Sequence, residues 1–285
     1  MFKEHIRQAK GFSKKVIKKV RNKPATTKNL MFLHMPKTGG TSLRNALSVS
    51  LGGRPQTIDI GQLRKSLYSI SSFETEDHNY YSASGTYQEF LLTYYLNHNL
   101  SFISGHFTTS KMTLDMFQGR YWFVTCLRDP LERFISQYLY DKFLELKSNG
   151  RASLDITDSA REKELQNYLK SWRGWFVSHI YIWMLGGHKY TDELNSISAK
   201  TIAKENIARF DLVGFTDALP EFTDQLGKLI NCKLKIKLDN STKKQSENNE
   251  IDLDPYRDLF TVEVREQITN LCKDDYEIYH YAKQM

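Results

Sequence analysis

Five short apolar runs alternate with longer helical patterns along the 285 residues of this chain. The runs are the segment NLMFLHM before Pro36 and the stretches 56–60, 100–104, 121–127 and 210–215. Helical patterns begin at Thr41 and recur at 86–97, 130–147, 192–208 and 219–230. Strands that alternate with helices favour a parallel sheet covered on both faces. We therefore predict an α/β fold, a three-layer sandwich with a central parallel sheet flanked by helices, whose ligands bind beyond the carboxyl ends of the strands.

The remainder of the chain gives no sign of a second domain. Residues 239–255 are polar and lack periodicity, which predicts a loop or flap. The last stretch, 255–282, has the pattern of two helices. Without internal repeats or a linker-like composition, we predict one domain over 30–285, preceded by a leader over 1–29.

The leader holds most of the positive charge. Residues 1–29 contain ten Lys or Arg against one acid, Glu4, so the leader has a net charge of +9. The whole chain has a net charge of +7, so the rest of the chain has a net charge of −2. Its apolar residues recur at roughly helical spacing. Such a basic amphipathic helix can lie on an anionic membrane or bind an acidic polymer. A solvated leader without a partner is the alternative, and we expect no nucleic-acid partner.

The loop HMPKTGGTS, at 34–42, follows the first apolar run and precedes a helix. Gly39 and Gly40 allow close approach of an anion, and Lys37 adds a mobile charge. Hydroxyl donors stand at Thr38, Thr41 and Ser42. Backbone amides at a helix N-terminus complete an anion site. In the nucleoside-triphosphate loop the lysine follows the glycines, whereas here it precedes them. A simple glycine turn is the other interpretation.

A second polar site follows the run at 121–127. Asp129 suits the N-cap of the next helix, with Pro130 at its first position. Arg128 stands at the strand end, and Ser136 lies two turns into the helix. Guanidinium and hydroxyl groups together suit a second phosphate. Alternatively, Arg128 pairs with a carboxylate at the helix start.

The two motifs, PKTGGTS at 36–42 and LRDPLERFISQY at 127–138, resemble those of the sulfotransferases. The similarity is to carbohydrate O-sulfotransferases related to heparan sulfate 2-O-sulfotransferase. It extends to SGHF at 104–107, to FDLVGFTDAL at 210–219 and to DDYEIYHYA at 274–282. The resemblance therefore spans the chain from about residue 30 to its end.

This resemblance implies a P-loop-like three-layer sandwich and 3′-phosphoadenosine 5′-phosphosulfate (PAPS) as the donor. Because the sulfuryl group carries only one charge, we expect that no metal is required. The residues that would hold the 5′-phosphosulfate are Lys37, Thr38, Gly39, Gly40, Thr41 and Ser42. The 3′-phosphate would lie on Arg128 and Ser136. Lys37 would also stabilise the leaving group, and His106 would serve as the general base. His34 is the rival base, although its place in an apolar strand favours a core histidine.

The acceptor is less well defined. Residues 150–190 are rich in tryptophan and tyrosine, which can stack on sugars but are also typical of a buried helix. We expect a glycan, a glycolipid or a small molecule as acceptor. Three widely separated cysteines and the absence of a long apolar run predict a cytoplasmic enzyme, with the leader as a contact to the inner membrane face.

Two alternatives remain from different classes. One is an ATP-dependent P-loop kinase, which the position of Lys37 and the lack of an evident magnesium-binding acid disfavour. The other is a non-catalytic, nucleotide-binding homologue at the membrane. The presence of Lys37, Arg128, Ser136 and His106 disfavours this second alternative.

Overall fold

The computed structural model describes residues 28–58, 60–70, 78–152, 157–186, 197–236 and 242–285. The predicted leader therefore lies outside the described residues except for Lys28 and Asn29. Asn29 already belongs to the first strand. In the described parts of the chain, no helix combines the length and apolar character needed to cross a membrane.

A four-stranded parallel sheet forms the centre of the fold. Its strands are β1 (Asn29–Leu33), β2 (Phe102–Gly105), β3 (Tyr121–Leu127) and β4 (Leu212–Phe215), in the order β2-β1-β3-β4. Leu33 pairs with Gly105 on one side and with Thr125 on the other. The predicted α/β fold is confirmed. Since β1 lies between β2 and β3, the loops that follow these three strands meet at one edge of the sheet.

The predicted strand at 56–60 is wrong. Gln56 forms only an isolated parallel bridge to Ile103, and helix α3 begins at Ile60. The apolar run was too short to show whether its backbone would extend the sheet. A single bridge to the edge strand β2 therefore stands in place of the fifth strand that we expected.

Helices surround the sheet and extend from it. They are α2 (Gly40–Ser50), α3 (Ile60–Ile70), α4 (His78–Asn97), α5 (Lys111–Phe117), α6 (Pro130–Ser148), α7 (Asp158–Lys170), α8 (Trp172–Ser178), α9 (Ile180–Gly186), α10 (Ile197–Ile207), α11 (Leu219–Leu229), α12 (Thr242–Asn248), α13 (Asp254–Arg257), α14 (Val262–Leu271) and α15 (Lys273–Gln284). A 3-10 turn, η2 (Thr216–Ala218), joins β4 to α11.

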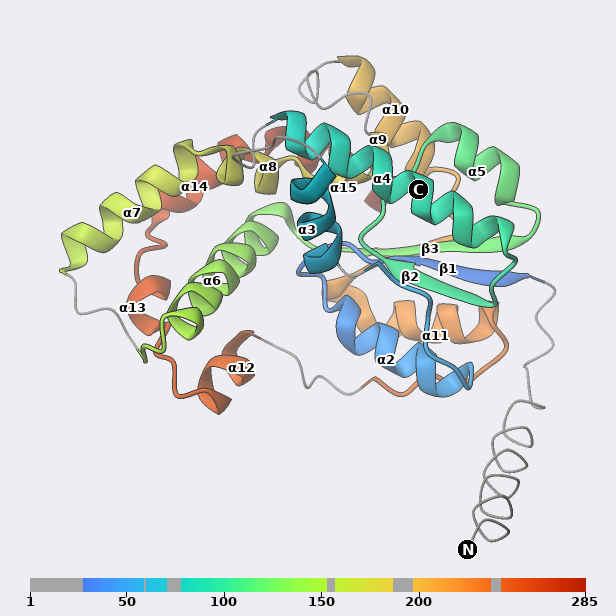
Figure 1. Cartoon of the computed structure of the whole chain (residues 1–285), viewed down its shortest axis with the longest axis horizontal. Helices are drawn as coiled ribbons and strands as arrows, with labels where there is room; N and C mark the ends of the chain where they lie inside the picture. Colours follow the sequence, from blue (N-terminus) through green and yellow to red (C-terminus); the bar gives the residue numbers. More distant parts are fainter. Residues whose placement is uncertain (1–27, 59, 71–77, 153–156, 187–196, 237–241) are drawn as a thin grey trace, which may run out of the picture.

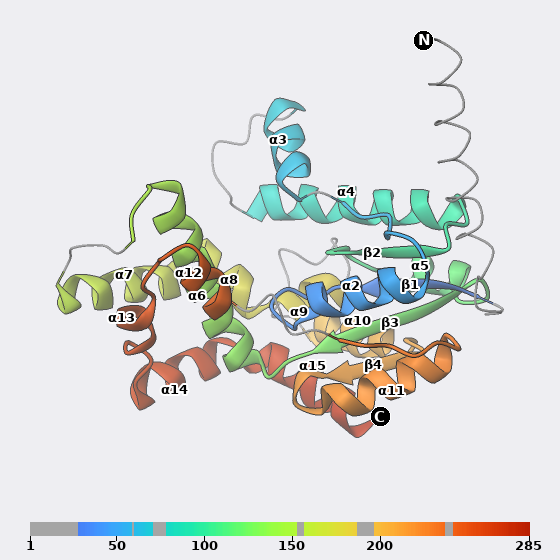
Figure 2. The ribbon, with the colours of Figure 1, turned by 90° about the horizontal axis from the view of Figure 1, so that it is seen from below.

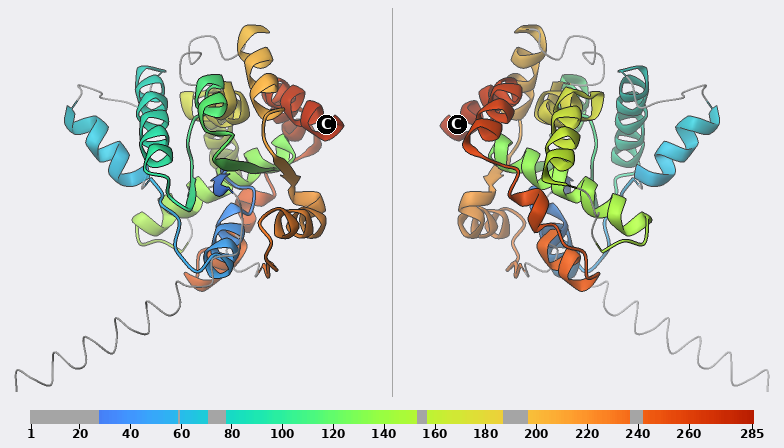
Figure 3. Two further views of the ribbon diagram at one scale, coloured as in Figure 1. Left: turned by 90° about the vertical axis from the view of Figure 1, so that its right-hand side faces the viewer. Right: turned by 90° about the vertical axis from the view of Figure 1, so that its left-hand side faces the viewer.

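Alternate residues of β1 face opposite layers. Leu30 and Phe32 pack in the cluster that includes residues of α2 and α11. Met31 and Leu33 pack in the cluster that includes residues of α4, α5, α9, α10 and α15. Figure 1 shows these two helical layers on either side of the sheet, and Figure 3 shows them end-on. Figure 2 views the molecule from below, with α2 in front of the strands. The strands are mainly apolar because helices cover both faces of the sheet.

A second group of helices extends beyond the sheet (Figure 1). Helix α6 leaves β3 and packs with α7, α8, α13 and α14 around a separate apolar cluster. Phe134, Tyr138 and Tyr256 are central members of this cluster. Helix α12 lies against α6. The long helix α6 therefore connects the sheet to the second group.

The predicted helices at 130–147 and 219–230 are confirmed as α6 and α11. The pattern at 86–97 is the second half of α4, and α10 covers only part of 192–208, because 187–196 lie outside the described residues. The loop predicted over 239–255 was wrong in part, since it contains α12. Three helices, α13 to α15, occupy the stretch expected to hold two. The polar helix α12 has no apolar stripe of its own and is held by packing against α6.

Candidate functional site

A cleft of about 1460 Å³ opens at the carboxyl ends of β1, β2 and β3. It lies between the sheet edge and the helices α4, α6, α8, α9 and α12, which all contribute lining residues. The predicted site residues that line it are Lys37, Gly39, Gly40, Thr41, Ser42, His106, Arg128 and Ser136. Thr38 is the predicted residue outside this lining. The tertiary structure thus brings together Lys37 and Arg128, which lie 91 positions apart in the sequence.

The loop after β1 has a strongly curved backbone. Lys37 (φ 63°) and Gly39 (φ 72°) both adopt left-handed conformations, and Gly39 is the N-cap of α2. The first helical bond runs from the amide of Ser42 to the carbonyl of Gly39 (3.1 Å), so the amides of Gly40 and Thr41 precede it. These amides carry the positive end of the helix dipole. The loop is therefore a backbone site for an anion.

Gly40 is required by close packing rather than by its backbone conformation. A Cβ atom at this position would lie 2.0 Å from Cδ2 of His34 and 2.3 Å from its Nε2. His34 is buried, at 6% exposure, and its ring lies against the loop. The sequence predicted that both glycines admit an anion, whereas the structure shows that Gly40 also makes room for the His34 ring.

Thr38 has a structural hydrogen bond. Its hydroxyl donates to the carbonyl of Met35 at 2.9 Å, and the residue is only 1% exposed. The side chain therefore closes the turn after β1, and only its backbone amide is left for the predicted contact with an anion.

Lys37 places a positive charge in the cleft without a close carboxylate partner. Its Nζ donates to Oγ1 of Thr242 at 3.1 Å and lies 4.0 Å from the ring centre of Tyr140. In the described part of the chain, Lys37 makes no ion pair with a carboxylate. Burial, together with repulsion by Arg128, lowers its pKa from 10.5 to about 8, although Asp141 acts in the opposite direction. The ammonium group is thus desolvated and suited to receive an anion.

Arg128 faces the same cleft from the end of β3. Its Nη1 donates to the carbonyl of Lys37 at 3.4 Å, so the two predicted motifs touch. Its Nη2 also lies 3.5 Å from Oε2 of Glu132, the pairing that we considered as an alternative. This pair is partly exposed and therefore weak. Ser136 is half-buried and lines the cleft further along α6.

Two histidines lie side by side at the ends of β1 and β2. Nδ1 of His106 is 2.5 Å from the carbonyl oxygen of His34, and the ring centroids are 4.5 Å apart. A carbonyl only accepts, so Nδ1 carries the proton and Nε2 of His106 is left as the basic nitrogen. Burial is the main cause that lowers the pKa of each ring, with Arg44 acting in the same direction. His106 is therefore neutral near pH 7.

Aromatic side chains line the cleft on the His106 side. Tyr81 of α4 stacks on Phe176 of α8 with centroids 3.9 Å apart, and Phe176 meets Trp183 of α9 edge-on at 5.0 Å. The segment after His106 is hydrogen-bonded to both α4 and α9. Thr108 donates to the carbonyl of Gly85 in α4 (2.8 Å), and the amide of Thr109 donates to the carbonyl of Met184 in α9 (2.9 Å).

The sequence left open whether the tryptophans of 150–190 belong to the core or face a ligand. The structure differs from one tryptophan to the next. Trp183 is 3% exposed and yet lines the cleft, so it serves both as core and as wall. Trp172 is 49% exposed and does not line the cleft.

Three further residues line the cleft and were not predicted as site residues from the sequence: Thr242, Asp141 and Arg173. Arg173 donates to both carboxylate oxygens of Asp141, at 2.9 and 3.0 Å, in the floor of the cleft. These partners come from α8 and α6, with no regular spacing between them. Thr242 lies in a polar stretch without periodicity. No local signal identifies contacts of this kind.

The family to which the chain belongs is consistent with this cleft. Residues 24–282 match the sulfotransferase family. No curated protein matches the chain. The family match covers most of the chain and includes every residue that faces the cleft from the loops after β1, β2 and β3. The chain belongs to the sulfotransferase family and is a PAPS-dependent sulfotransferase.

Proposed function

We propose that this enzyme transfers the sulfuryl group of PAPS to a hydroxyl group of a carbohydrate or glycolipid, with His106 as the general base. The observation that carries the proposal is the cleft itself. It joins the amides of the loop after β1, the guanidinium of Arg128 and the imidazole of His106 in one space. We place the enzyme with the carbohydrate O-sulfotransferases of the heparan sulfate 2-O type on the basis of its motifs.

The donor side is made of two cationic receptors. The first is the loop at 37–42, where the first amides of α2 and the Lys37 ammonium suit the phosphosulfate group. The second is Arg128 with Ser136, which suits the 3′-phosphate. Since β1 and β3 are neighbours in the sheet, both receptors open into the same cleft. When bound, PAPS supplies the activated sulfuryl group.

Lys37 has the properties of a group that stabilises negative charge on a leaving oxygen. Its half-buried ammonium contacts a hydroxyl and an aromatic ring, both neutral. A partly desolvated charge interacts more strongly with an anion than a hydrated one does. We assign this role to Lys37 and expect the fixed amides of the loop to assist it.

His106 has the tautomer that a base requires. The His34 carbonyl holds the proton on Nδ1, so Nε2 is available to accept the proton of an acceptor hydroxyl. The resulting imidazolium would retain its hydrogen bond to the carbonyl. His34 is less suitable because it is more deeply buried and fills the space above Gly40.

The walls near His106 support a sugar acceptor. Tyr81, Phe176 and Trp183 present aromatic surface, on which a sugar ring can pack. Gln88 and Trp183 also line the cleft, and each has a buried polar atom without a hydrogen-bond partner among the described residues, Oε1 and Nε1 respectively. A polyhydroxylated acceptor offers both donors and acceptors to such groups.

Labelled PAPS with a panel of acceptors tests this proposal. Neutral and acidic oligosaccharides, glycolipids and phenols are compared using the wild-type enzyme and His106→Ala. Transfer to sugar hydroxyls by the wild type alone is expected. Transfer only to phenols would refute the carbohydrate assignment, and an unimpaired variant would refute the assignment of the base.

Calorimetry tests the donor independently of the acceptor. We expect 3′,5′-ADP to bind without magnesium and to bind more tightly than 5′-AMP. Binding of ATP with magnesium, in the absence of any binding of 3′,5′-ADP, would instead support the kinase alternative.

For the leader, we propose peripheral attachment to an anionic membrane at the cytoplasmic face. The support is the sequence of 1–29 with its ten basic residues. Removing residues 1–25 should abolish binding to vesicles that contain phosphatidylglycerol and leave turnover of a soluble acceptor unchanged. Equal vesicle binding by both forms would contradict this assignment.

A further inference from the structure

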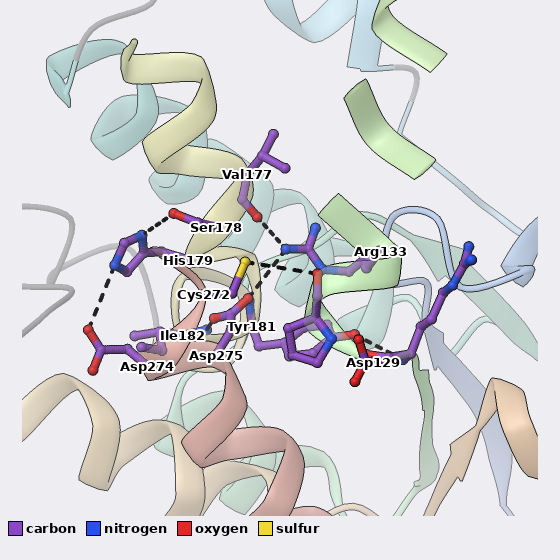
Figure 4. A network of polar contacts seen from close by, with 12 residues as sticks. Asp129, Arg133, Val177, Ser178, His179, Tyr181, Ile182, Cys272, Asp274 and Asp275 are labelled. Atoms are coloured by element: carbon purple, nitrogen blue, oxygen red, sulfur yellow. Dashed lines mark hydrogen bonds and ion pairs between the residues drawn. The ribbon is translucent and has the colours of Figure 1, made fainter. Parts of the chain in front are cut away.

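A buried polar network that the proposed reaction does not use joins α6, α9 and α15 (Figure 4). Its centre is an ion pair between Arg133 of α6 and Asp275 of α15, with Nη2 and Oδ2 3.5 Å apart. The side chains are 1% and 0% exposed. The Asp275 carboxylate also accepts hydrogen bonds from the amides of Tyr181 (3.1 Å) and Ile182 (3.2 Å) at the start of α9. Three helices distant in sequence are thus joined at one carboxylate.

Tyr181 connects this network to the cleft. Its hydroxyl donates to the carbonyl of Arg128 at 2.6 Å and accepts from the amide of Arg128 at 2.9 Å. The tyrosine is fully buried. Because β3 ends at Leu127, the backbone of Arg128 lies beyond the strand ladder. One phenol oxygen therefore satisfies both polar groups of the Arg128 backbone and holds the direction in which its side chain leaves the chain.

The ion pair is poorly explained by stability alone. Removing two charges from water is costly, and apolar residues of similar size often replace such a pair without loss. Arg133 also donates to the carbonyl of Val177, at the end of α8. The pair therefore fixes α8 and α9 relative to α6, and with them the position of the Tyr181 hydroxyl.

We propose that Tyr181 is a positioning residue for the donor nucleotide, supported by Asp275 and Arg133, and that it sets the selectivity for a 3′-phosphate by holding the Arg128 backbone. The proposal rests on the proposed role of Arg128 at that phosphate. A guanidinium that binds two oxygens depends on its orientation. If the Arg128 backbone can move, the 3′-phosphate loses this contact while the phosphosulfate loop is unaffected.

The test compares two nucleotides that differ in the 3′-phosphate alone. Calorimetry gives the Kd of 3′,5′-ADP and of 5′-AMP for the wild type, Tyr181→Phe, Arg128→Ala and the double variant. The ratio of the two Kd values measures the selectivity for the 3′-phosphate. We expect Tyr181→Phe to reduce this ratio about tenfold, mostly through 3′,5′-ADP, since small misplacements of a binding group are costly. The double variant should show no further loss beyond Arg128→Ala.

Tyr256→Phe is the matched control. It also removes a buried phenol oxygen, but this oxygen has no hydrogen-bond partner among the described residues, and Tyr256 lies outside the cleft lining. The control should retain the wild-type ratio. If it lost selectivity as Tyr181→Phe does, the effect would be a general one of removing buried phenols, and the proposal would be refuted.

The remaining outcomes separate this inference from the proposed function. A Tyr181→Phe enzyme with a lower melting temperature and an unchanged ratio would make Tyr181 merely structural. If Arg128→Ala kept the ratio, the assignment of Arg128 itself would be wrong. Should Tyr181→Phe be too unstable to purify, Asp275→Asn keeps the tyrosine hydroxyl and weakens its support. This variant should lose part of the selectivity, and a wild-type ratio there would also refute the proposal.

Discussion

The carbonyl oxygen of His34 lies 2.5 Å from Nδ1 of His106. This contact joins the residue after β1 to the residue after β2 and determines which nitrogen of His106 is basic. The ring of the same His34 lies where a Cβ atom of residue 40 would be. The buried residue His34 therefore contacts both the donor loop, through its ring, and the proposed base His106, through its carbonyl oxygen.

The first prediction concerns the base. His106→Ala should lower kcat by about 10²- to 10⁴-fold, the usual contribution of general base catalysis. The Kd of 3′,5′-ADP should stay close to that of the wild type, because the phosphate receptors are intact. Steady-state kinetics and calorimetry measure the two effects separately. A parallel loss of nucleotide affinity would show that His106 shapes the donor loop instead.

The second prediction concerns pH. Burial is the main cause that lowers the pKa of Lys37 to about 8. The alkaline limb of the kcat/KM profile should therefore lie near pH 8, where Lys37 loses its proton. The acid limb should lie below pH 6.5, because burial lowers the pKa of His106 and this group acts as a base when neutral.

Asp141 provides a check on that assignment. Its charge raises the pKa of Lys37, so Asp141→Asn should move the alkaline limb to lower pH. Asp224→Asn removes an exposed carboxylate that pairs with Lys228 on α11 and should leave the limb in place. Equal pH profiles for the wild type and Asp141→Asn would argue that another group controls the alkaline limb.

The third prediction concerns the loop glycine. Gly40→Ala should destabilise the fold by about 1–3 kcal/mol, since the added methyl overlaps the His34 ring and the neighbours are closely packed. Activity should fall as well, because the ring shifts toward His106. Gly53→Ala is the matched control, with no atom within 4 Å of its added Cβ and no left-handed backbone. Denaturant unfolding that gave equal stabilities for the two variants would contradict the packing argument.

The fourth prediction concerns the buried ion pair. Asp275→Asn should reduce the free energy of unfolding at pH 7 by about 3–5 kcal/mol, because the Arg133 charge would be left without its partner. Denaturant unfolding measures the difference. A loss below about 1 kcal/mol would mean that Arg133 finds another partner.

The sequence by itself determined the class of fold and most of the candidate site. Apolar runs that end in polar residues predicted parallel strands, and four of the five expected strands are present. The loops after β1 and β3 and the histidine after β2 were identifiable because ligands of such sheets bind at the strand ends. The position of Lys37 before Gly39 and Gly40 already distinguished this loop from the phosphate-binding loop of enzymes that use nucleoside triphosphates.

The tertiary structure decided which of these residues meet. Strand pairing places β1 between β2 and β3, and the short run at 56–60 contributes only a bridge. The contact of Lys37 with Thr242 spans 205 positions, and that of Arg128 with Tyr181 spans 53. Periodicity along a chain reports which side chains are buried, but it carries no information on their partners. Those partners follow from the packing of whole helices against the sheet, which also explains why Gly40 must lack a side chain and why Tyr181 lies behind Arg128.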